Sequence, residues 1–253
     1  MIKGIKPSDR RNDVIFIVVF LQRSSTTRDE EKEIDHCFAV TNITPDSLEW
    51  RLNFKKSISK TDPLTYMSLR LRKHIEEIIA LTDAEFDYIL SHFELKKFRK
   101  HQFVVQEGNY VEQEYFVLEG LLKSTYLNDD GKEHILQFSM ENWWVTDYQA
   151  FNNHEKATLN IDCIEDVSVL VLTDFNKSKL CSEMHKMEHF FRIKTNTGYV
   201  GLQQRILSFL KFDARARYMH LIEKYPQLYQ RVPKTLMASY LGVSRETLSR
   251  FTA

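Results

Sequence analysis

Near its end the sequence places arginine, glutamate and serine side chains at a spacing that suits contacts with DNA bases, in the run Ser244-Arg245-Glu246-Thr247-Leu248-Ser249-Arg250. An arginine at the start of a helix can donate to guanine O6 and N7, and a glutamate beside it can accept from a cytosine amine. Hydroxyl groups and helix-end N–H groups can hold phosphates. We therefore expect contacts with DNA from Thr235, Ser244, Arg245, Glu246, Ser249 and Arg250.

Residues 232–251 predict the two short helices, joined by a tight turn, that would position these side chains. Gly242 falls where the turn needs a positive φ, and Pro233 suits the start of the first helix. Ser244 is placed to cap the second helix, and Glu246 in its first turn suits the positive end of the helix dipole. The spacing favours a helix-turn-helix over a plain helical hairpin with a solvated polar face. The apolar positions of such a crossing are Met237, Ala238, Leu241, Val243, Leu248 and Phe251.

The composition is that of a globular protein without an overall charge. The chain has 253 residues, of which 43% are hydrophobic and 28% charged, and its formal net charge is zero. From Arg205 to Ala253, however, nine lysines and arginines face three acidic residues, an excess that would attract phosphate to this end. The cysteines Cys37, Cys163 and Cys181 form no CxxC motif, which is typical of a cytoplasmic protein without disulfides.

The first 66 residues carry no pattern that continues into the rest of the chain. The apolar run at 14–21 has eight residues, too few for a helix that crosses a membrane, and no small-residue cleavage site follows it. A buried strand is the alternative for this run. We expect an accessory extension or an incorrectly assigned start at 1–66, and no membrane partner.

Residues 67–183 predict a domain in which helices precede short strands. Apolar residues recur at helical spacing up to Phe93, and Thr82 with Glu85 predicts a capping box. Glycines at intervals of twelve and eleven residues then separate β-prone runs, with a hairpin turn at 128–131. This rhythm predicts an antiparallel sandwich, jelly roll or barrel. The predicted strands lie at 103–105, 115–118, 134–138 and 167–172.

Residues 184–212 predict one long helix. Gly198 and Gly201 are costly in a lone helix unless another backbone approaches there. An apolar stripe on such a helix favours the interface of a symmetric dimer, and the alternative is a helix packed only on its own sandwich. The stripe comprises Phe190, Ile193, Thr197, Val200, Ile206, Leu207 and Leu210.

The order of these parts resembles the Crp/Fnr family of bacterial transcription regulators, from Met67 to Phe251. The family's recognition-helix pattern S-R-E-T-x-x-R is matched at 244–250, and residues 214–249 are similar to the branch common in Bacteroidetes. The resemblance implies an α+β fold: an N-terminal jelly-roll sensor domain of the cyclic nucleotide-binding type (67–183), a dimerisation helix (184–212) and a helix-turn-helix domain (213–253). It also implies a homodimer that binds palindromic double-stranded DNA.

The sensor departs from the family members that bind cyclic AMP. Those carry a Gly-Glu pair and an Arg-Ser/Thr-Ala run, whereas this chain has 141–147, without the pair, and then Glu155-Lys156-Ala157-Thr158. Lysine supplies a point charge where arginine offers a two-pronged fork. We expect no cofactor, and either another small ligand or none. The expected pocket residues are Trp143, Trp144, Thr146, Lys156 and Thr158.

Two further interpretations would give the chain a function other than transcription regulation. The chain stops three residues after Arg250, so a ligand-binding or scaffold protein with impaired DNA binding is the alternative function. Residues 185–189 match the zinc-peptidase motif HxxEH, but the downstream carboxylate ligand would fall in the dimer helix or DNA domain. His134 stands alone where a metal-binding sandwich needs a pair. We therefore expect no metal site and no enzyme.

Overall fold

The structure, a computed structural model, describes residues 63–251, with side chains from Ser68 onward. The predictions for the apolar run at 14–21 and for nearly all of the extension at 1–66 lie outside the described residues. The described part belongs to one compact unit, Trp50–Ala253. No helix within it is long and apolar enough to cross a membrane.

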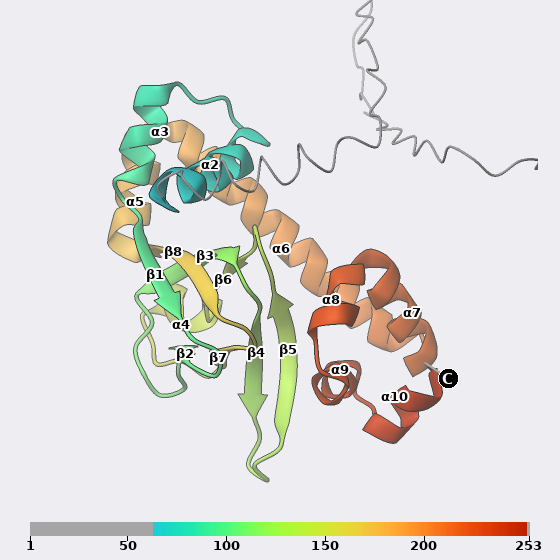
Figure 1. The fold of residues 1–253 in the computed structure, drawn as a ribbon. Coiled ribbons are helices and arrows are strands. Elements are labelled where there is room, and N and C mark those ends of the chain that lie inside the picture. Colours follow the sequence, from blue (N-terminus) through green and yellow to red (C-terminus); the bar gives the residue numbers. More distant parts are fainter. Residues whose placement is uncertain (1–62, 252–253) are drawn as a thin grey trace, which may run out of the picture. The chain divides into compact units, whose positions relative to one another are not determined.

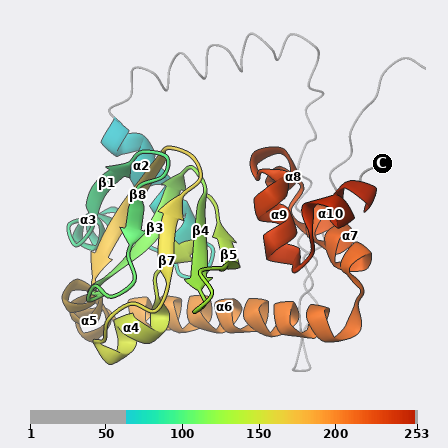
Figure 2. The same ribbon diagram turned by 90° about the horizontal axis from the view of Figure 1, so that it is seen from below.

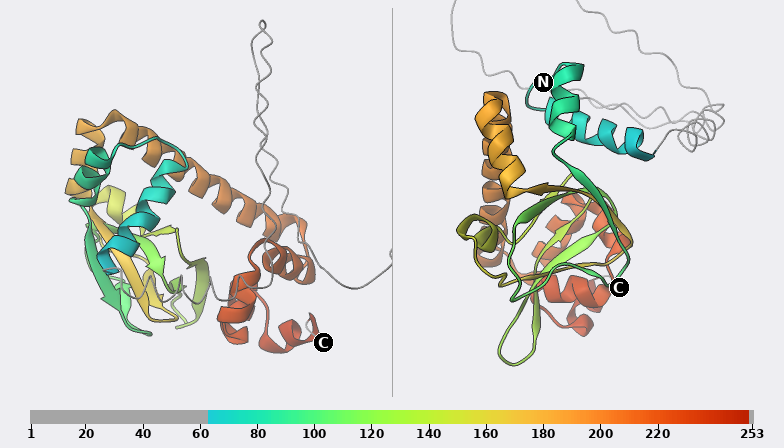
Figure 3. Two further views of the ribbon diagram at one scale, coloured as in Figure 1. Left: turned by 45° about the horizontal axis from the view of Figure 1, so that its top comes forward. Right: turned by 90° about the vertical axis from the view of Figure 1, so that its left-hand side faces the viewer.

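Two helices open the described chain, α2 (Pro63–Glu76) and α3 (Asp83–Leu90). The predicted capping box is confirmed: Thr82 Oγ1 accepts from Glu85 N–H, and Glu85 Oε2 accepts from Thr82 N–H at 2.8 Å. Both helices lie beside the first part of α6 (His185–Lys211), as Figure 3 shows.

Eight strands form two four-stranded antiparallel sheets, which confirms the predicted jelly-roll type of fold. The first sheet has the order β1 (Glu94–Phe98), β8 (Val167–Thr173), β3 (Gln113–Glu119) and β6 (Trp144–Val145). The second has the order β2 (Phe103–Val105), β7 (Asn160–Cys163), β4 (Leu122–Leu127) and β5 (Glu133–Ser139). Figure 1 shows both sheets. The four predicted strands correspond to β2, β3, β5 and β8.

Two turns of the predicted sensor domain require glycine because their backbone has a positive φ. Asn128 to Gly131 closes the β4–β5 hairpin as predicted, with Gly131 at φ 74° and its N–H donating to Asn128 O at 2.9 Å. Gly120 lies between β3 and β4 at φ 100°, where a Cβ would stand 2.3 Å from the backbone oxygen of Asp166. Only glycine fits that position.

Side chains alternate between the two faces of each sheet, and both faces are covered. Val117 and Val169 point between the sheets with Leu122 and Ile161. Their neighbours Phe116, Leu118, Leu170 and Leu172 point outward and pack against α2, α3, α5 (Asp174–Glu183) and the start of α6.

The long helix α6 has 27 residues and changes its surroundings along its length (Figure 2). Met187, Phe190 and Phe191 are buried in the sensor core. Beyond them large apolar side chains are exposed, including Tyr199, Val200, Leu202, Ile206 and Leu210. A Cβ at Gly198 or Gly201 would meet nothing within 4 Å in this chain.

Four helices follow: α7 (Ala214–Lys224), α8 (Pro226–Arg231), α9 (Lys234–Leu241) and α10 (Arg245–Phe251). They share a hydrophobic core with the outer face of the second sheet, because Leu121, Ile135, Phe138 and Ile164 pack among their apolar residues. Helix α9 lies beside β5 (Figures 1 and 2). The helix-turn-helix is therefore docked on the sensor.

Candidate nucleic-acid interface and sensor cavity

The turn between α9 and α10 has the geometry that the sequence predicts. Gly242 adopts φ 70°, and Val243 N–H donates to Ala238 O at 3.0 Å across the turn. Ser244 Oγ accepts from Thr247 N–H at 3.2 Å and so caps α10. Leu248 is buried on the opposite face of α10. Because Leu248 points into the core, the other side of α10 points outward.

The residues expected to contact DNA lie on the outer side of the two helices. Arg245, Glu246, Ser249 and Arg250 are exposed along α10, and Thr235 is exposed at the start of α9. The backbone N–H at the helix start, the Ser244 hydroxyl and the two arginines all lower the pKa of Glu246, which stays ionised at neutral pH. The structure thus presents two guanidinium groups and one carboxylate on adjacent turns. That set can pair with guanine and cytosine edges in a major groove.

Arg217 of α7 forms hydrogen bonds with the residue that follows α6 and with the last residue of α9. Its Nη1 donates to Phe212 O at 2.8 Å and its Nη2 to Leu241 O at 2.9 Å, at the end of α9. The guanidinium also lies 4.7 Å from the ring centre of Phe209. Asp213 caps α7 by accepting from Ala216 N–H at 2.8 Å. These contacts join the end of α6 to α7 and α9.

Arg205 of α6 joins three elements at one point. Its Nη2 donates to Ile135 O in β5 at 3.0 Å and to Tyr240 O in α9 at 3.1 Å. The guanidinium stacks 3.6 Å from the ring centre of Tyr240. Sequence analysis missed this role, because the partners are backbone oxygens that leave no mark in the sequence.

Arg231, the last residue of α8, contacts two acids of the sensor. Its guanidinium donates to Glu141, in the β5–β6 turn, at 2.8 and 3.0 Å, and to Glu165, in the β7–β8 turn, at 3.0 and 2.6 Å. Glu141 also accepts from Gly120 N–H at 3.0 Å. In the sequence Arg231 was only one residue of the segment 214–249 that carries part of the family resemblance, and nothing there indicated this contact.

The residues expected to line a ligand pocket do not meet in one cavity. Trp143 stacks against Tyr225 at 5.4 Å between ring centres, whereas Trp144 Nε1 donates to His74 Nε2 at 3.3 Å in the helical core. Thr146 is buried and donates to Gln113 O at 2.8 Å. The exposed Lys156 lies 5.9 Å from the ring centre of Tyr110.

Asp147 joins the start of α4 to residues 158–159 through its carboxylate, and sequence analysis did not single it out. Its carboxylate accepts from the backbone N–H groups of Thr158 at 2.8 Å, Leu159 at 3.1 Å and Ala150 at 3.2 Å. The Thr158 hydroxyl adds a fourth contact at 3.2 Å. Asp147 is 1% exposed and caps α4 (Tyr148–Asn153). The protein's own carboxylate therefore satisfies these N–H groups.

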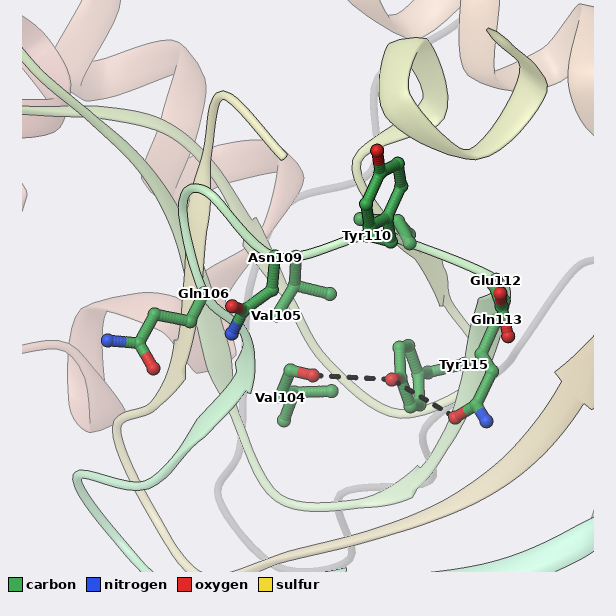
Figure 4. A pocket seen from close by; sticks show the side chains of 9 residues that line it. Val104, Val105, Gln106, Asn109, Tyr110, Glu112, Gln113 and Tyr115 are labelled. Carbon is green, nitrogen blue, oxygen red and sulfur yellow. Dashed lines mark hydrogen bonds between the residues drawn. The ribbon is translucent and has the colours of Figure 1, made fainter. Parts of the chain in front are cut away.

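A small cavity of about 250 Å³ lies beside the loop that joins β2 to β3 (Figure 4). Tyr115 OH donates to Val104 O at 3.2 Å across it, and Tyr110 forms a backbone bridge with Lys156 at its edge. The remaining lining residues are Val105, Gln106, Asn109, Val111, Glu112 and Gln113.

The HxxEH residues do not converge on a metal site. His185 and His189 are exposed, and His189 Nδ1 lies 2.8 Å from Arg192 Nη2. Within residues 63–251 no group of three histidine, cysteine, aspartate or glutamate side chains could hold a metal ion.

Known proteins match the chain in both sequence and structure. Residues 95–182 match the cyclic nucleotide-binding domain family. The anaerobic regulatory protein of Bacillus subtilis (strain 168) is 30% identical over 89 residues, and this alignment covers 35% of the chain and 36% of that relative.

Two solved structures share the fold at low sequence identity. FixK2 from Bradyrhizobium japonicum superposes with a TM-score of 0.54 and 18% identity over 63% of this chain and 82% of FixK2. CLP, a c-di-GMP responsive global regulator of Xanthomonas campestris, gives a TM-score of 0.54 and 16% identity over 65% of this chain and 87% of CLP.

A β-roll that matches the cyclic nucleotide-binding domain family, continued by a long helix and a helix-turn-helix, defines the class of fold to which this chain belongs. Within this class the chain is similar to regulators of the Crp/Fnr type, to which the order of its parts also pointed.

Proposed function

We propose that this protein is a cytoplasmic, homodimeric transcription regulator that binds a palindromic DNA site and acts without enzymatic catalysis. The observation that carries the proposal is the exposed face of α10, where Arg245, Glu246, Ser249 and Arg250 point away from a buried Leu248. Thr235 and the start of α9 add groups that suit phosphate contacts.

The exposed half of α6 supports the homodimer. Ile206 is 62% and Leu210 77% exposed, and Tyr199 lies about two and three turns before them on the same side of the helix. A row of large apolar side chains on one helix face is stabilised when a second copy covers it. We call α10 the reading helix and the helical domain that carries it, 213–251, the reading head. Two reading helices related by two-fold symmetry would then contact two half-sites.

A small ligand other than a cyclic nucleotide is the proposed signal. Asp147 already binds the N–H groups around α4, and the exposed Lys156 supplies only a single point charge. The cavity beside the β2–β3 loop is the proposed site for the ligand.

The first experiment is a selection of bound sequences from a random DNA pool with the full-length protein at physiological salt. We expect a palindrome whose half-site centres lie about 10 base pairs apart, one helical turn. The double variant Arg245→Ala/Glu246→Ala, which keeps the buried Leu248, serves as the control and should lose base preference at the positions that these two side chains contact. Failure of the folded, dimeric wild-type protein to enrich a palindrome would refute the proposal.

A further inference from the structure

Arg231 connects the helix-turn-helix to two separate turns of the sensor. Both of its acidic partners lie far from it in sequence, Glu141 in the β5–β6 turn and Glu165 in the β7–β8 turn. The planar guanidinium donates to both carboxylates at once, which fixes direction as well as distance. The contact therefore restrains the orientation of α8, and of the helices that follow it, against the sensor.

The surroundings strengthen this restraint. The side chains of Arg231 and Glu141 are each 23% exposed and that of Glu165 is 34% exposed. One cation lies between two carboxylates, so its removal would leave two neighbouring anions without their shared partner. The other cations that line the adjoining groove, Lys97 and Arg99, belong to the sensor and cannot hold the reading head.

The β5–β6 turn carries Glu141 and so connects the Arg231 contact with the rest of the sensor. Val117 N–H donates to Trp143 O at 2.9 Å, which fixes the turn on β3. Trp143, two residues after Glu141, meets the ring of Tyr225 of the helical domain edge to face. The chain then passes through β6 to Asp147, which anchors α4. Glu141 is therefore joined to the start of α4 by only six residues of continuous chain.

The exposed face of α10 remains uncovered while Arg231 is bound to both acids, since Arg245 and Arg250 are exposed in this structure. The contact thus does not block the reading face, and what it fixes is orientation.

We infer that Arg231 is a positioning residue that holds the reading helix at one angle to the sensor and thereby sets the half-site spacing that the dimer accepts. Movement of Glu141 with the sensor changes this angle. The inference rests on the proposed function, because spacing has a meaning only for a dimer that reads two half-sites.

The first test measures docking without DNA. Trp143 lies at the sensor–head boundary and its emission reports on contact with Tyr225. We expect Arg231→Ala to shift the emission to longer wavelength, with the shift absent in a Trp143→Phe background. Arg215→Ala, which removes the same charge from an exposed position on α7, is the matched control and should leave the spectrum unchanged.

The second test measures spacing. The selected half-sites are joined at separations that differ by single base pairs, and binding of each duplex is compared with binding of one isolated half-site. We expect two variants, the single substitution Arg231→Ala and the double substitution Glu141→Gln/Glu165→Gln, each to reduce the preference for the best spacing about tenfold. Their affinity for one isolated half-site should stay at the wild-type level. Combining the substitutions should add no further loss, and Arg231→Glu/Glu165→Arg should recover part of the preference.

The outcomes separate the two proposals. A wild-type protein that selects no DNA site refutes the proposed function, while the Trp143 spectrum still decides whether Arg231 holds the head on the sensor. An unchanged spacing preference in Arg231→Ala, with or without a spectral shift, overturns the positioning role. A loss of half-site affinity equal to the loss of spacing preference also overturns it, since the residue would then only stabilise the fold.

Discussion

At the scale of single residues, arginines fall into two groups with different partners. Arg205, Arg217 and Arg231 direct their guanidinium groups to backbone oxygens or carboxylates inside the protein. Arg245 and Arg250 are exposed on α10. The first group joins the C-terminal helices to one another, to α6 and to the β-roll, and the second is proposed to contact DNA, so substitutions in the two groups should change different properties.

Arg245→Ala tests the second group. We expect a loss of about 1–3 kcal/mol in specific binding and a relaxed preference at one base pair, because a bidentate contact to guanine is removed. Competition binding with the selected site and its single-base-pair variants measures both effects. Arg215→Ala removes the same charge from α7 and should weaken binding slightly and evenly across sequences. An unaltered base preference in Arg245→Ala would show that another residue reads that position.

His74 makes stability depend on pH. Burial first, and Lys194 second, lower its pKa from 6.5 to about 4, with Glu77 opposing. Between these values the unfolded chain binds more protons than the folded chain, so stability falls as the pH drops from 6.5 to about 4, and this contribution changes no further below. His74→Gln, whose amide can still accept from Trp144, should flatten this part of the profile in denaturant unfolding. The exposed His185→Gln should leave it unchanged, and an equal slope in wild type and His74→Gln would contradict the assignment.

At the scale of elements, local signals predicted the α9–α10 turn and the capped start of α3. Glycine at a positive φ, a serine cap and a capping box each act within four residues, so the sequence contains the whole interaction. The strands β4 and β7 were missed because Lys123, Ser124 and Asp162 are polar yet paired within the sheet. The contacts of Arg205 and Arg231 join residues 35 to 90 positions apart, which local patterns cannot reveal.

Gly242→Ala tests the turn. A residue with a Cβ at φ 70° is strained, and the nearest atom, of Phe209, stands at an ordinary 3.6 Å. We expect destabilisation of about 1–2 kcal/mol from the left-handed backbone, together with weaker DNA binding. Gly131→Ala places the same strain at φ 74° in the β4–β5 hairpin, with nothing within 4 Å. It should lower stability similarly and leave DNA binding of the folded fraction intact. Equal DNA affinities for both variants would show that the turn does not orient α10.

The α4 region provides a test of ligand class. Since Asp147 accepts from three backbone N–H groups, we expect cyclic AMP and cyclic GMP to leave the melting temperature unchanged. Asp147→Asn keeps an acceptor oxygen and removes the negative charge, and it serves as the matched variant. A rise in melting temperature of the wild-type protein with either nucleotide would refute the proposed ligand class.

At the scale of the whole molecule, the proposed function depends on what covers the exposed part of α6. The N-terminal turns of the helix are buried in the sensor, whereas its later turns expose apolar side chains over the length that leads to the reading head. Arg205 lies within this exposed part and contacts both β5 and α9. A partner helix packed here would therefore adjoin the junction between sensor and reading head in each protomer.

Ile206→Asp tests this arrangement. A carboxylate on the apolar face would be desolvated in a dimer without a partner, so we expect a monomer in sedimentation velocity. Loss of the second reading head should weaken binding to the palindrome by about 10²–10⁴-fold while binding to one half-site is retained. Phe175→Asp, at a 76% exposed position on the sensor helix α5, is the matched control and should remain dimeric. A dimeric Ile206→Asp with full affinity would place the interface elsewhere, and Arg205 would then join domains within one chain only.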